Sequence, residues 1–112
     1  MRDDLIALLK TIIPNTYGIG EWNGRVMDNI LLIRKDSFLP SVNCNLAGWQ
    51  QWTVQVYTSK GLHELDVICE QIKNILLNNG FEITNIINGD FYNRSLQAYV
   101  SSISFKYPIT IN

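Results

Sequence analysis

The chain has 112 residues, of which 46% are hydrophobic and 17% charged, and its formal net charge is −1. This length predicts a single domain over residues 1–112, with a core large enough to fold without disulfide staples. The scattered Lys and Arg residues offer no basic groove for nucleic acid, and no apolar run is long enough to span a membrane.

The first predicted element is a helix over residues 3–13. Its Leu and Ile residues recur at helical spacing, and Pro14 ends it because proline cannot continue a helix. Residues 15–25 are rich in Gly and Asn and predict a loop. Residues 26–34 then predict a strand, whose continuous apolar run from Ile30 to Ile33 indicates burial on both faces, or a helix and a sheet on opposite sides.

Residues 35–50 predict a long connection, because they follow neither the helical nor the strand period. A structureless connection of this length inside a compact domain is usually functional or mobile. Residues 51–59 return to regular structure as a second strand. Trp52, Val54 and Val56 alternate there with polar side chains, which predicts that they face the core.

Residues 61–79 give the strongest helical pattern in the chain, with Gly80 as a left-handed cap. Its predicted core stripe consists of Leu62, Leu65, Ile68, Cys69, Ile72, Ile75 and Leu76. Residues 81–87 and 95–107 predict a third and a fourth strand. The order is therefore α-β-β-α-β-β, and it predicts an α+β fold: an antiparallel sheet of about four strands with the helices packed on one face.

The sequence contains no recognisable catalytic or metal-binding constellation. His63 is the only histidine and lies on the polar side of the predicted second helix. Asp66 and Glu70, four residues apart, are typical of a solvated helix face. Cys44 has no neighbouring His, Lys or helix start that would lower its thiol pKa. We therefore expect no enzymatic activity, no cofactor and no metal ion.

Several large apolar residues fall outside the predicted core. Trp22 and Trp49 lie in predicted loops, where a tryptophan either covers the core or anchors an interface. Phe38 and Leu39 lie in the long connection, and Val67 falls on the polar side of the second helix.

The last residues continue a strand pattern beyond Pro108, with Ile109 and Ile111 alternating with polar residues. They lack a predicted partner, because the domain is complete at Tyr107. Two alternatives remain open at this point. The tail crosses to a neighbouring subunit, or it folds back on its own sheet.

The chain resembles one group of viral proteins in the order of its elements and in several segments. These segments are DLIALLK, GRV, LDVICEQIKNIL followed by NGFEI, and the closing YPI. The group consists of the tail-terminator and tail-completion, or head–tail joining, proteins of long-tailed bacteriophages and phage-like contractile particles. The resemblance implies a homo-oligomeric ring, commonly a hexamer, that caps the tail tube and joins it to the head or collar. It carries over no catalytic residues.

The implied partners are other copies of the chain, the tail tube, and sheath, head-completion or collar proteins. The implied location is the cytoplasm of the bacterial host during assembly, and then the virion or tail particle. The predicted interface residues are Phe38, Leu39, Trp49, Trp22, Val67, Ile109 and Ile111. Two other functions stay open: a small peptide- or protein-binding adaptor that acts by strand addition at an exposed edge, and an enzyme of unrecognised type.

Overall fold

The computed structural model describes residues 2–18, 29–41, 44–87 and 92–110. Within these ranges the chain forms two helices and six strands. In chain order they are α1 (Arg2–Lys10), β1 (Thr16–Gly18), β2 (Ile30–Ser41), β3 (Cys44–Thr58), α2 (Leu62–Asn78), β4 (Glu82–Ile87), β5 (Tyr92–Asn93) and β6 (Ala98–Thr110).

The six strands form one mixed sheet in the order β1-β2-β3-β6-β4, with β5 paired to the start of β6. The β1–β2 pair is parallel and the other pairs are antiparallel. The predicted four-stranded antiparallel sheet with the order α-β-β-α-β-β is therefore wrong. The two extra strands, β1 and β5, span three and two residues, which is too short for an alternating pattern to be recognised.

The predicted long connection over residues 35–50 is also wrong, because most of it belongs to β2 and β3. Leu39 pairs with Trp49, and Phe38 pairs with Gln50. The ladder shifts register between Lys35 and Phe38. Such a bulge changes which side of the sheet the following residues face, so the period of two is interrupted in the sequence.

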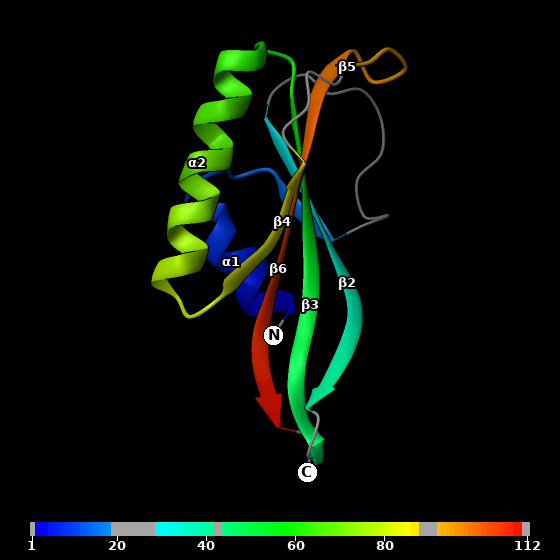
Figure 1. The fold of residues 1–112 in the computed structure, drawn as a ribbon. Coiled ribbons are helices and arrows are strands. Elements are labelled where there is room, and N and C mark those ends of the chain that lie inside the picture. The colour runs from blue at the N-terminus through cyan, green and yellow to red at the C-terminus, as the bar shows by residue number, and fades with distance from the viewer. Residues whose placement is uncertain (1, 19–28, 42–43, 88–91, 111–112) are drawn as a thin grey trace.

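Both helices pack against one face of the sheet (Figure 1). Trp52 is 2% exposed, which confirms its predicted place on the core side of the strand. The same alternation buries Val54 and Val56 beside it. The core that results is formed by Leu5 and Leu9 of α1, Leu65, Ile68, Ile72 and Leu76 of α2, and Leu31, Ile33, Trp52, Val54, Val56, Ile103 and Phe105 of the sheet.

The second helix is confirmed, because α2 covers Leu62–Asn78 and the predicted span was 61–79. Its buried residues are Leu65, Ile68, Cys69, Ile72 and Leu76, all from the predicted stripe. Of the other two stripe residues, Ile75 is partly buried against the core, and Leu62 is 37% exposed at the first turn. Val67 and Leu77 are 40% and 52% exposed, on the polar side where the helical period places them.

Gly80 follows α2 with a φ of +84°, the left-handed conformation that its role as a helix cap requires. A Cβ at this position would lie 3.4 Å from Cε2 of Tyr107. We expect Gly80→Ala to lower the free energy of unfolding by about 1–2 kcal/mol, because an L-residue is strained in this conformation. Urea unfolding followed by circular dichroism measures this loss.

Gly61→Ala serves as the control for this variant. Gly61 also has a positive φ, +110°, but no atom lies within 4 Å of a Cβ placed there. Similar losses in the two variants would assign the effect to backbone conformation rather than to Tyr107. An unchanged urea midpoint in Gly80→Ala would contradict the prediction.

Three strands extend beyond the helices and form what we call the arm: residues 34–41 of β2, 44–51 of β3 and 106–110 of β6. In Figure 1 the arm runs toward the bottom of the view, away from α2. It lengthens the molecule, whose principal extents are 45 × 24 × 24 Å.

The last strand of the arm corrects the prediction that the chain has no partner beyond Tyr107. Pro108 pairs with Trp49, and Ile109 pairs with Gly48 of the same chain. The partner exists because β3 begins at Cys44, before the predicted strand start. The tail therefore folds back on its own sheet through Thr110. Ile111 lies outside the described residues.

Candidate functional site

The arm brings together four of the predicted interface residues, Phe38, Leu39, Trp49 and Ile109. Leu39 lies opposite Trp49, and Trp49 lies opposite Pro108 on its other side. Directly paired residues have their side chains on the same face of a sheet. Leu39, Trp49 and Pro108 therefore form a row across all three strands of the arm.

This row lies on the face of the sheet away from the helices, which we call the open face. Leu39 is 40% exposed, Trp49 is half-buried and Pro108 is exposed. The ammonium of Lys106 lies 4.3 Å from the ring centroid of Trp49 and 3.6 Å from a carboxylate oxygen of Glu82. A cation over an indole at this distance is attracted by the ring, so Lys106 helps to hold Trp49 in place.

The opposite face of the arm carries Phe38, Tyr107 and Ile109, all half-buried. Gln50 lies among them and is 6% exposed. Its side-chain amide donates to the carbonyl oxygens of Asp36, at 2.8 Å, and Gln51, at 3.0 Å. The bulge takes Asp36 out of the regular ladder, and Gln50 supplies a donor for its carbonyl, which a buried backbone group requires.

A polar network joins the three strands where the arm begins. The Asp36 carboxylate accepts from Arg34 Nε at 2.8 Å and from Thr53 Oγ1 at 2.5 Å. Thr53 Oγ1 also lies 3.1 Å from Ser104 Oγ. These contacts link β2, β3 and β6 on the open face, and they support a structural role for the network.

The edges of the arm are poor sites for strand addition. The β1–β2 ladder covers only residues 31–33, and the β4–β6 ladder ends at Lys106. In the described ranges, the outer edge of β2 in the arm and the outer edge of β6 beyond Lys106 therefore have no neighbouring strand. Each of these edges contains a proline, Pro40 or Pro108. Proline lacks the N–H group that a new strand needs, and natural proteins use it to protect edges. The faces of the arm are therefore better binding surfaces than its edges.

The structure does not bring all the predicted interface residues together. Val67 lies on the exposed side of α2, away from the arm. Trp22 and Ile111 lie outside the described residues. Lys106 and Pro108 join the arm surface although the sequence did not point to them, because their contacts with Trp49 depend on the register between two distant strands.

Two features of the described residues bear on chemistry: the lack of a metal-ligand cluster and the buried thiol of Cys69. Among the described residues, no group of three or more His, Cys, Asp or Glu side chains could hold a metal ion. Burial raises the pKa of the Cys69 thiol above its usual value, although a hydrogen bond with Ser101 acts in the opposite direction. A thiol held in its neutral form is a poor nucleophile.

Comparison with known proteins does not assign the chain to a family: no family model matches it, and no curated protein matches it. Neither helix in the described part of the chain combines the length and apolar character needed to cross a membrane. The arm, with apolar side chains on both faces, is the feature from which a function can be argued.

Proposed function

We propose that this chain is a structural assembly protein whose copies associate head to tail into a closed ring. The ring caps a tail tube and joins it to a head or collar, as in the phage tail-terminator and head–tail joining proteins that the sequence resembles. The observation that supports self-association is the arm, because it extends beyond the helices and has partly exposed apolar residues on both faces. The tube and collar partners rest on the resemblance.

A projecting arm suits a ring better than a symmetric dimer. A closed ring is built from heterologous contacts, in which one surface of each subunit binds a different surface of the next. The arm provides one such surface, and its apolar side chains can be buried by a neighbour without changing the core beneath the helices. Burying one exposed Leu in this way contributes about 1.5–3 kcal/mol.

The strand-addition adaptor is the less favoured function, because a proline lies in each outer edge of the arm. An adaptor would also act as a monomer that binds an extended peptide. The two functions therefore differ in the oligomeric state that they require.

We expect the purified chain to form rings at micromolar concentration, alone or on tail-tube polymers assembled from the tube protein of the same genome. Light scattering should give a mass several times that of the 12.8 kDa chain, and negative-stain images should show closed rings. A chain that stays monomeric both with and without the tube would contradict the proposal. A two-fold dimer that does not grow further would also contradict it.

A further inference from the structure

Two surfaces of this chain carry opposite charge. In the arm, three of the four charged side chains are basic: Arg34, Lys35 and Lys106, against Asp36. In α2, three of the four charged side chains are acidic: Glu64, Asp66 and Glu70, against Lys73. The chain as a whole has a net charge of only −1, so these two elements differ in sign although the whole chain is nearly neutral.

Two cations, Arg2 and Lys35, lie where the arm joins the helical layer. The Arg2 guanidinium lies 5.9 Å and the Lys35 ammonium 6.0 Å from the ring centroid of the buried Trp52. Both cations are exposed, and neither forms an ion pair within the described residues. We call Arg2, Lys35 and Trp52 the arm base. Phe38 lies on the same face of the sheet, because it follows Lys35 across the bulge and pairs with the helix-facing Gln50.

The acidic charge lies on the exposed side of α2. Asp66 and Glu70 are both exposed and are one helical turn apart, so they lie on the same side of the helix. Glu70 forms an ion pair with Lys73, whose ammonium lies 2.9 Å from the Glu70 carboxylate. Val67, 40% exposed, is the exposed apolar residue that follows Asp66, whereas Leu65 and Ile68 are buried. Like the arm base with Phe38, this surface combines two charges of one sign with an apolar side chain.

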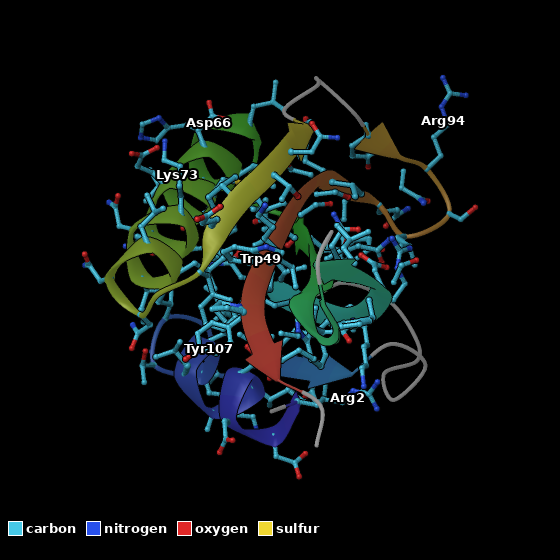
Figure 2. All side chains as sticks on the ribbon, turned by 60° about the horizontal axis from the view of Figure 1, so that its bottom comes forward. Arg2, Trp49, Asp66, Lys73, Arg94 and Tyr107 are labelled. Atoms are coloured by element: carbon cyan, nitrogen blue, oxygen red, sulfur yellow. The ribbon has the colours of Figure 1, made fainter. Side chains whose placement is uncertain are left out.

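The two surfaces are far apart on one molecule. Figure 2 shows Asp66 and Lys73 on one side of the view and Arg2 on the other, and in Figure 1 the arm extends away from α2. One copy can therefore use both surfaces at once, with a different neighbour at each. This is the geometry of a heterologous contact, which closes into a ring when the rotation between copies permits it.

We infer that the arm base of one copy binds the acidic side of α2 in the next copy, an inference that rests on the self-association proposed above. Arg2 and Lys35 face Asp66 and Glu70 of the neighbour, and Phe38 packs against its Val67. The charges fix the orientation and register of the contact, which is the main contribution of complementary charge at an interface. Like charges would meet if two arms, or two α2 surfaces, came together, so head-to-head pairing is disfavoured.

Charge reversal tests this contact. The variant Arg2→Glu/Lys35→Glu reverses the arm base, and the variant Asp66→Lys/Glu70→Lys reverses α2. We expect each variant alone to need about tenfold or more protein to assemble, because like charges now meet at the contact. An equimolar mixture of the two should assemble again, since the acidic arm base of one variant meets the basic α2 of the other. All four substitutions in one chain should also restore assembly.

Lys10→Glu is the control for the single variant Lys35→Glu, because both reverse one exposed lysine. Lys10 lies at the end of α1, outside both surfaces. Lys10→Glu should assemble like the unsubstituted chain. If the reversed variants also assemble normally while the chain forms rings, the α2 contact is wrong and the proposed ring stands. Loss of assembly that neither the mixture nor the fourfold variant restores overturns the contact as well. A chain that stays monomeric before any substitution overturns both proposals.

Discussion

Phe105→Ala is expected to lower the free energy of unfolding by about 3–5 kcal/mol, the range for removing a buried aromatic side chain. Phe105 is 0% exposed in β6 and lies in the core between the sheet and the helices. Its ring meets Phe81 edge to face, with centroids 5.3 Å apart and an interplanar angle of 83°. The variant loses this pair and leaves a cavity that its close-packed neighbours cannot fill.

Tyr92→Ala provides the comparison for Phe105→Ala in the same urea-unfolding measurement. Tyr92 also makes an edge-to-face contact, with Tyr99 at 4.9 Å, but it is 46% exposed. Its loss should lower the free energy of unfolding by only about 0.5–1.5 kcal/mol, the value of an aromatic pair beyond its buried area. Equal losses in the two variants would show that burial in this core is not what stabilises the fold.

The elements that the sequence predicts well are those whose pattern is local and long. The stripe of α2 repeats over 17 residues, so its helical period was clear and its buried side was predicted correctly. Trp52, Val54 and Val56 of β3 alternate without interruption and are all buried. In both cases, one face of one element packs on the core. Under that condition, the spacing of apolar residues in the sequence predicts the type of element and its buried face.

The arm could not be predicted in this way, because its strands depend on pairing between distant residues. Pro40 and Gly48 are poor strand formers, yet they pair with each other across the β2–β3 ladder. The bulge after Lys35 interrupts the alternation at the point where the arm begins. Local propensity therefore indicated a loop, and only the neighbouring strands make the segment extended.

The candidate site was predicted in part, by residue type rather than by position. Large apolar residues in a predicted loop were interpreted as interface residues, and Leu39 and Trp49 do lie side by side on one face of the arm. Their interface role stays a prediction. The neighbouring Pro108 and Lys106 come from the last strand, so their place depends on the β3–β6 register.

The double variant Leu39→Ser/Trp49→Ser tests whether the open face of the arm adds to the ring contact made by the arm base, and it should weaken ring formation strongly and leave the monomer folded. Leu39 is 40% exposed and Trp49 is half-buried, and both lie on the open face of the arm, beyond the helices. The folded monomer gains little from them. A ring contact that buries them fully would gain about 1.5–3 kcal/mol from each, so their loss weakens assembly far more than folding.

Two measurements on this variant separate assembly from stability: the melting temperature by circular dichroism, and the mass by light scattering. Leu77→Ser is the control, because Leu77 is 52% exposed on α2 and lies outside the arm, about two helical turns beyond Glu70. It should keep both the mass and the melting temperature of the unsubstituted chain. A collapse in the melting temperature of the double variant would show that these side chains belong to the core. Rings formed normally by that variant would show that the open face of the arm is not where the subunits meet.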